Sequence, residues 1–293
     1  SIRRQRQMCI RDRKCVVHSK RKIFVKKPEI INNYLEEYLN KVRSKGRYTF
    51  TWLEAKKQFD VSDKALNQSL YRLKSKKRVA QIRKGFYAII TPEYSSRGMV
   101  PAHLFINDLM KSLNRRYYVG LLSAAALHGA SHQQPMEYFV ITEKPAMRNI
   151  RNKKLAINFY VKKQWSNDNI VEKKTEAGYI NVSSPELTAL DLFYYLDSFG
   201  INKIATILKE LMEEFKISDL VRTAKNYPQT SAIQRLGYML DKEFNNKKLS
   251  DPLIKILNDR RPFVVPLSLN KNKEGRIDDK WKVLKNMEVE SDI

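Results

Sequence analysis

Polar side chains suited to contacting nucleic acid recur at helical spacing between residues 62 and 75. If Leu66, Leu70 and Leu73 face a core, a rotation of about 100° per residue turns the polar positions between them outward. Asparagine and glutamine amides pair with adenine edges, and lysine or arginine pairs with guanine or phosphate. The spacing therefore predicts a recognition helix, with Lys64, Gln68 and Tyr71 opposite the core and Asn67 and Arg72 on its flanks.

Further cations follow this predicted helix. Lys76 belongs to a Lys-Lys-Arg run at its end, where positive charge also suits the helix dipole, and Arg83 and Lys84 occupy the tip of a predicted hairpin. Hairpin cations of this kind contact phosphate or the minor groove. Two alternatives stay open from composition alone: an ordinary solvated helix face and a protein-docking module. The expected DNA-binding residues are Lys64, Asn67, Gln68, Tyr71, Arg72, Lys76, Arg83 and Lys84.

The elements that could hold these side chains are all predicted between residues 28 and 91, which we expect to form a winged helix-turn-helix domain. Apolar residues at three- and four-residue steps indicate a helix over 29–45 that ends at Gly46. Thr51 and Ser62 are suited to capping two short helices. Gly85 permits the positive φ that a tight hairpin needs between strands at 78–83 and 86–90.

Charge points to the same segment. The whole chain has a formal net charge of +25, which favours a polyanionic partner. Residues 28–85 contain fourteen Lys and Arg against six Asp and Glu, whereas residues 86–293 contain 31 against 24. A local excess of this kind indicates a binding face better than the overall charge does. No apolar run is long enough to predict a membrane span.

Residues 1–27 are expected to be a basic leader that is disordered or non-native. They carry eleven Lys and Arg against one Asp, and the run from Gln7 to Arg13 resembles the translation of a sequencing-library adaptor. A basic arm for the minor groove is the functional alternative. Without this leader the net charge is still +15, from 45 basic and 30 acidic residues. Both cysteines, Cys9 and Cys15, lie within it, so the remaining sequence predicts no disulfide and favours a cytoplasmic protein.

Beyond residue 91 the sequence predicts a linker over 92–102 and a mixed α+β domain over 103–293. The linker is rich in Pro, Ser and Gly. Helical segments, four β-like runs and a strong helix start at Ser184-Pro185-Glu186 then follow. The overall fold class is therefore α+β.

Residue types that could support catalysis do not form a convincing set. His128 and His132 have metal-ligand spacing, but Gly129 is expected to end the helix between them, and no HExxH pattern or cysteine cluster accompanies them. Asp191 is a conceivable general base, although a surface or capping carboxylate is the simpler interpretation. Phosphate-binding glycine loops and a GxSxG nucleophile motif are missing from the sequence. We therefore expect no enzymatic activity, no metal and no cofactor.

Three segments resemble the AbiEi antitoxin C-terminal domain. They are the runs at 117–135, with Tyr117 to Ala130 followed by His132-Gln133-Gln134-Pro135, at 182–192, from Val182 to Asp191-Leu192, and at 234–241, from Gln234-Arg235 to Asp241. Their order and approximate spacing also agree with that family. The predicted winged helix before them is the N-terminal partner expected there.

The resemblance implies the antitoxin of a type IV toxin–antitoxin pair linked to abortive phage infection. In such proteins the winged helix is expected to bind inverted repeats in promoter DNA and repress the operon, an arrangement that favours two copies on DNA. The C-terminal domain is expected to contribute to DNA binding and to be needed for neutralisation. The implied functional partner is a nucleotidyltransferase-like toxin, without a stable complex. A module that neutralises the toxin by direct binding is the alternative.

Overall fold

A computed structural model describes residues 28–130, 136–272 and 274–290 of the chain, and the side chains from residue 34 onward within them. The predicted leader over 1–27 and His132 lie outside these residues. Secondary structure in the described part is a mixture of helices and three separate sheets, so the predicted α+β class is confirmed. None of its helices is long and apolar enough to cross a membrane.

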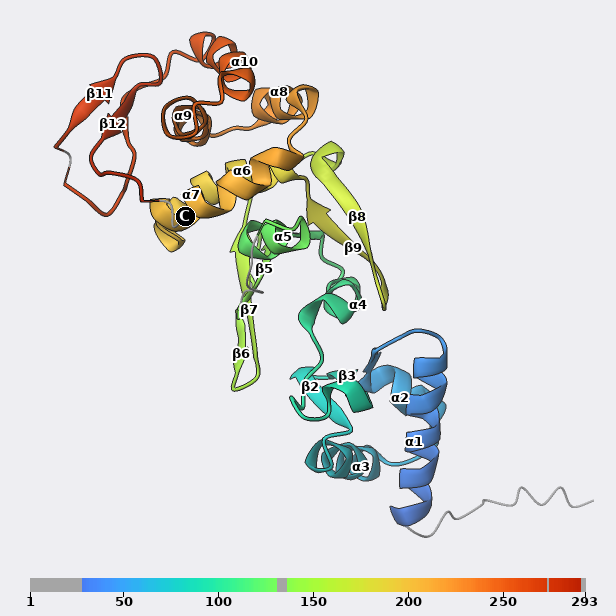
Figure 1. The fold of residues 1–293 in the computed structure, drawn as a ribbon. Coiled ribbons are helices and arrows are strands. Elements are labelled where there is room, and N and C mark those ends of the chain that lie inside the picture. The colour runs from blue at the N-terminus through green and yellow to red at the C-terminus, as the bar shows by residue number, and fades with distance from the viewer. Residues whose placement is uncertain (1–27, 131–135, 273, 291–293) are drawn as a thin grey trace, which may run out of the picture.

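The first module, residues 28–91, contains three helices and one three-stranded antiparallel sheet of strand order β1-β3-β2 (Figure 1). Local capping explains where its short helices begin. The Thr51 hydroxyl accepts a hydrogen bond from the Glu54 amide, and Ser62 accepts one from Ala65. The elements are α1 (Pro28–Ser44), β1 (Thr49–Thr51), α2 (Trp52–Gln58), α3 (Asp63–Ser75), β2 (Val79–Arg83) and β3 (Phe86–Ile89).

One core holds this module together. Leu35 and Leu39 of α1 meet Leu66 and Leu70 of α3 in a single apolar cluster. Phe50 of β1 lies at its centre, stacked on Tyr87 of β3 at 5.4 Å between ring centroids. The predicted apolar stripe of α3 is therefore the buried stripe, because Leu66, Leu70 and Leu73 are each at most 2% exposed.

The segment predicted as a linker packs against both parts of the chain. It contains the 3-10 helix η1 (Pro92–Tyr94), and Met99, Val100 and Ala102 are buried. The 3-10 helix η2 (Ala102–Leu104) and α4 (Ile106–Ser112) follow. One apolar cluster joins β2 and β3 to this segment and to the second domain. Because that core crosses the segment, the domain boundary at 92–102 stays a prediction.

The described chain from residue 103 onward, which we call the second domain, is built on a six-stranded mixed sheet of order β6-β7-β5-β4-β9-β8. Pairs β5–β7 and β4–β9 are parallel, and the other neighbours are antiparallel. Strands β4 and β6 are short and were not predicted from the sequence. The strands are β4 (Tyr117–Val119), β5 (Tyr138–Thr142), β6 (Ile150–Asn152), β7 (Leu155–Val161), β8 (Ile170–Thr175) and β9 (Gly178–Ser183).

Helices pack against this sheet, and most of them lie on the side of the domain away from the first module (Figure 1). Ser184 caps α6 with Pro185 in its first turn, as the sequence predicts. A small sheet of order β10-β12-β11 closes the chain, with Trp281 buried against α9. The elements are α5 (Leu121–Leu127), η3 (Asn167–Asn169), α6 (Pro185–Tyr194), η4 (Leu196–Ser198), α7 (Ile201–Leu211), η5 (Met212–Glu214), α8 (Ile217–Asn226), α9 (Thr230–Tyr238), η6 (Met239–Glu243), α10 (Lys247–Asn258), β10 (Val265–Pro266), β11 (Arg276–Asp278) and β12 (Val283–Lys285).

Candidate nucleic-acid interface

Helix α3 presents the polar face that its sequence spacing predicts. Lys64, Asn67, Gln68 and Tyr71 are exposed, and the Tyr71 side chain is 68% exposed. Arg72 is half-buried on the flank of this face. Because the opposite stripe of the helix fills the core, these side chains can contact a partner without any change in packing.

Asn67 is held by a neighbour that the sequence spacing did not identify. The indole Nε1 of Trp52, in the first turn of α2, donates a hydrogen bond to Asn67 Oδ1 at 2.9 Å. An amide oxygen has two lone pairs, so Asn67 Oδ1 can accept a second hydrogen bond while its NH2 group donates. Trp52 therefore orients Asn67 without removing its capacity to pair with an adenine edge. Only the folded arrangement of α2 and α3 brings the two residues together.

The hairpin between β2 and β3 carries the next two predicted residues, Arg83 and Lys84, both exposed at the turn. Gly85 adopts a φ of 77°, the positive value that the turn requires. Its carbonyl oxygen accepts a hydrogen bond from the Trp52 amide at 2.8 Å. Trp52 therefore ties the hairpin tip and the helix face to the same short helix.

The predicted cations are free of internal ion pairs. Lys64, Arg72, Lys76, Arg83 and Lys84 have no acidic partner within the part of the chain that the structure describes. Lys76 is exposed at the C-cap of α3. Two other cations of the module are paired: Arg47 with Glu54 at 3.0 Å and Lys56 with Asp63 at 2.7 Å. Helix α3 and the hairpin thus carry positive charge that no described acidic residue neutralises.

Asp191 of the second domain is not the surface or capping carboxylate that we expected. It is fully buried, and the Lys162 ammonium lies 2.5 Å from its Oδ1. The hydroxyls of Tyr118 and Tyr227 donate to its two oxygens at 2.7 and 2.8 Å. A carboxylate enclosed among partners from distant segments ties those segments together, and it has no open side for a substrate.

Burial of the cluster around Asp191 changes the pKa of its two tyrosines. Burial raises the pKa of Tyr118 and Tyr227 well above the ordinary tyrosine value, and the neighbouring Asp191 raises both further. Both hydroxyls therefore stay protonated and donate to the carboxylate. Lys162 also lies over the Tyr227 ring, 4.3 Å from its centroid.

The carboxylates nearest Asp191 in the sequence and the histidine His128 do not converge on one site. Buried Glu186 accepts a hydrogen bond from the Lys216 amide at 3.0 Å, whereas Asp197 is exposed. His128 ends α5, and its Nε2 is 2.7 Å from the Ser183 carbonyl oxygen, to which it donates. Burial lowers the pKa of His128. Among the described residues, no group of three His, Cys, Asp or Glu side chains could hold a metal ion.

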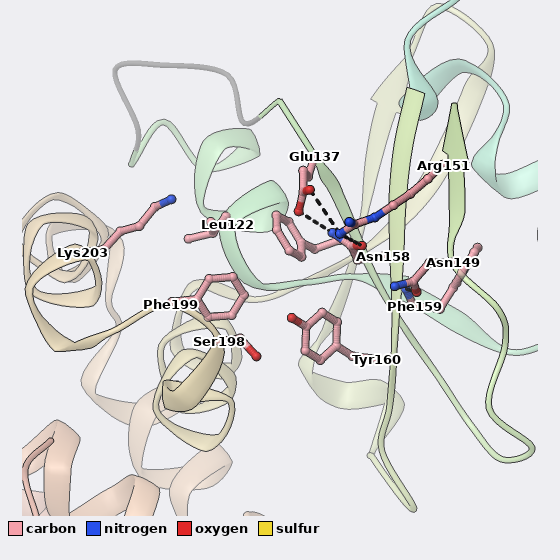
Figure 2. A pocket seen from close by; sticks show the side chains of 11 residues that line it. Leu122, Glu137, Asn149, Arg151, Asn158, Phe159, Tyr160, Ser198, Phe199 and Lys203 are labelled. Carbon is pink, nitrogen blue, oxygen red and sulfur yellow. Dashed lines mark hydrogen bonds and ion pairs between the residues drawn. The ribbon is translucent and has the colours of Figure 1, made fainter. Parts of the chain in front are cut away.

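A polar pocket of about 490 Å³ opens between β5, β6, β7 and α7 (Figure 2). Glu137 accepts hydrogen bonds from Arg151 at 3.3 Å and from Asn158 at 2.6 Å, so these three polar groups satisfy one another. Phe139 and Phe199 meet edge to face at 5.3 Å between centroids. No sequence motif indicated this pocket, because its residues come from six separate elements and the segments between them.

Taken together, the geometry defines a class: an α+β protein in which a basic helix-and-hairpin module is joined to a larger mixed-sheet domain. The family model described as the AbiEi antitoxin C-terminal domain matches residues 118–242. The resemblance to the AbiEi antitoxin family that the sequence implied is confirmed over these residues, and the match supports a role as an antitoxin in a toxin–antitoxin system. Similarity to an antitoxin domain implies a toxin as partner.

A solved structure shares the fold. The chain is similar to the Rv2827c protein from Mycobacterium tuberculosis, with a TM-score of 0.62 and 16% sequence identity over 86% of this chain and 91% of that one. Comparison with curated proteins gives no match.

Proposed function

We propose that this protein is the antitoxin of a type IV toxin–antitoxin pair and represses its own operon by binding inverted repeats in promoter DNA. In this proposal residues 28–91 act as a winged helix-turn-helix. Helix α3 is the recognition helix in the major groove, and the β2–β3 hairpin is the wing.

One observation carries the DNA-binding part of the proposal. An exposed helix face with amide, hydroxyl and cationic side chains lies beside a hairpin with two exposed cations, and none of these cations is paired within the described chain. A surface of this composition suits base edges flanked by phosphates. The element order, with three helices followed by a β-hairpin, supports the same assignment.

The toxin-directed part rests on the family. The segment matched by the antitoxin model lies entirely in the second domain, so we assign neutralisation to residues 103–290. The partner we propose is a nucleotidyltransferase-like toxin encoded beside this gene, neutralised without a stable complex. The protein is proposed to act in the cytoplasm and without catalysis of its own.

The test is a titration of the full chain against a duplex taken from upstream of its own reading frame. A scrambled duplex of equal length and composition is the reference. We expect the upstream duplex to bind at least about a thousandfold more tightly, since specific complexes exceed non-specific ones by that margin or more. Equal affinity for both duplexes would remove the operator-binding part of the proposal.

Direct sequestration of the toxin is the second candidate, and an apolar feature of the first module favours it. Leu53 on α2 is 66% exposed and Tyr71 on α3 is 68% exposed, as in protein-docking surfaces. Co-expression of the two neighbouring gene products with a tag on one decides between the candidates. A stable complex that survives size-exclusion chromatography would favour sequestration, and separate elution would favour the type IV assignment.

A further inference from the structure

The polar pocket of about 490 Å³ in the second domain has two chemically different sides (Figure 2). Lys203, in the first turn of α7, lies on one side, and Glu137 and Arg151 lie on the opposite side (Figure 2). The rings of Phe199 and Tyr160 line the same pocket. A cavity of this size is typical of sites for small molecules.

The side of the pocket formed by α7 offers a charge that nothing in the fold uses. The Lys203 ammonium is exposed and forms no ion pair or hydrogen bond with any described residue. Ser198, the last residue of η4, also lines the pocket, and its hydroxyl has no partner within the described chain. Lysine binds phosphate as a point charge, and a hydroxyl can donate to a phosphate oxygen. This side therefore suits a phosphate group.

The opposite side offers both an acceptor and a donor. Glu137 accepts hydrogen bonds from Arg151 and Asn158, but an ionised carboxylate has about four lone-pair sites, so it can accept another. Asn149 Oδ1 accepts a hydrogen bond from the Phe159 amide at 2.9 Å, which leaves the Asn149 NH2 group free to donate. Carboxylate and amide groups of this kind pair with the polar edges of nucleobases.

Aromatic rings complete the lining. The Phe199 ring lies 5.3 Å from that of Phe139, edge to face, and 6.3 Å from that of Tyr160, with 30° between the last two planes. Phe199 and Tyr160 pack against the main core of the second domain but are only half-buried. Contact between a planar base and such a ring is favourable whichever base is present.

We propose that this pocket binds a mononucleotide, with the phosphate at Lys203, the base against Phe199, and the polar edge of the base at Glu137 and Asn149. Two cations and one carboxylate line the pocket, so its charge favours an anion. Inorganic phosphate would use only the Lys203 side, and a nucleoside would leave Lys203 without a partner. None of the lining residues belongs to residues 28–91, so this site is separate from the proposed DNA-binding face.

The test is isothermal titration calorimetry of the full chain with AMP, GMP, CMP and UMP. Inorganic phosphate and the nucleoside that corresponds to the tightest of the four serve as references. At least one mononucleotide should bind with one-to-one stoichiometry and at least about tenfold more tightly than either reference, since each reference lacks one of the two contacts.

Two variants separate the contacts of the phosphate from those of the base. Lys203→Gln should weaken mononucleotide binding about tenfold, the effect of one lost charge-assisted hydrogen bond, and leave nucleoside binding unchanged. Phe199→Leu should weaken both about tenfold through the lost ring contact. Lys209→Gln, which removes the same charge from an exposed position of the same helix outside the pocket, is the control and should bind as the unaltered chain does. Thermal melting verifies that each variant folds.

Three results would overturn the proposal. The first is that none of the four mononucleotides binds at millimolar concentration. The second is that phosphate or the nucleoside binds as tightly as the mononucleotide, which would reduce the pocket to a site for one of these groups alone. The third is that Lys203→Gln and Lys209→Gln bind alike, which would place a bound nucleotide elsewhere. This last comparison decides the matter even if Phe199→Leu fails to fold.

Discussion

The first module and the second domain use ionisable side chains in opposite ways. On α3 and the β2–β3 hairpin, the cations are unpaired within the described chain, and all of them except the half-buried Arg72 are exposed. In the second domain Lys162 and Asp191 are 7% and 0% exposed and lie 2.5 Å apart. Exposed unpaired charge contributes nothing to folding and is available to a partner, whereas a buried pair is committed to the fold. This contrast separates binding residues from structural ones more sharply than net charge does.

The largest effect should come from removing the exposed face of α3. Alanine at Lys64, Asn67, Gln68, Tyr71 and Arg72 should lower affinity for the upstream duplex by about a thousandfold or more, to the level of non-specific DNA. The melting temperature should hardly change, since these side chains lie outside the core. Anisotropy and thermal melting measure the two effects. Asn40→Ala with Lys41→Ala, on exposed positions of α1, is the control. Retained operator affinity in the α3 variant would falsify the recognition-helix assignment.

Breaking the buried Lys162–Asp191 pair should lower the stability of the fold and leave DNA affinity unchanged. Asp191→Ala leaves the Lys162 ammonium buried without its partner, so unfolding should become easier by about 3–5 kcal/mol. Urea denaturation measures the loss. DNA affinity, measured well below the melting temperature of the variant, should be unchanged.

A neutral replacement of both partners checks the cause of that loss. Lys162→Met combined with Asp191→Asn removes the uncompensated charge and should recover part of the stability. If Asp191→Ala is as stable as the unaltered chain, the cluster is not structural. A metal-dependent hydrolysis lost in Asp191→Ala would instead revive the enzymatic interpretation.

Removing the positive charges of Arg83 and Lys84, on the proposed wing, should have an intermediate effect on DNA affinity. Arg83→Gln with Lys84→Gln should weaken binding to any duplex about tenfold and reduce the salt slope by about 2, because two phosphate contacts are lost. Specificity for the upstream duplex should persist, since α3 is intact. A salt slope equal to that of the unaltered protein would show that the hairpin does not approach the backbone.

The sequence predicts those features that depend on residues close together in the chain, and it misses those that depend on contacts between distant residues. The caps at Thr51 and Ser62, the leucine stripe of α3 and the turn at Gly85 are set by residues within one turn of each other, and all were predicted. Asp191 was misjudged because its partners Lys162 and Tyr227 lie 29 and 36 residues away.

A basic groove between the first module and the second domain was not predicted for the same reason. This groove runs along β2 and is lined by Lys74 of α3, Lys77 in the turn after α3, Arg83 and Lys84 of the β2–β3 hairpin, and Lys153 and Lys154 of the β6–β7 hairpin. Only the tertiary packing of Leu155 in one apolar cluster with β2 brings these segments together. The Trp52–Asn67 hydrogen bond, between residues 15 positions apart, is a smaller example. Each of these features needed the packed arrangement of separate elements.

The smallest expected effect is on the pH dependence of stability. It comes from the histidine His128, a further ionisable side chain of the second domain, which is half-buried. Burial lowers the folded-state pKa of His128, whose Nε2 donates to Ser183. A group with a lowered folded pKa stabilises the fold above its unfolded pKa, about 6.5, and that contribution is lost as pH falls through the folded value. The free energy of unfolding should therefore decline below about pH 6.5.

Part of this decline should disappear in His128→Gln, whose side chain cannot be protonated in that range. A further part should belong to His103, whose pKa burial also lowers. His103→Gln is therefore the matched variant, and the double variant should have the flattest profile of the three. None of the residues proposed to contact DNA is a histidine, so operator affinity of the folded protein should not follow the same curve. If affinity and stability declined together in every variant, the separation between an exposed binding surface and a buried structural interior would be wrong.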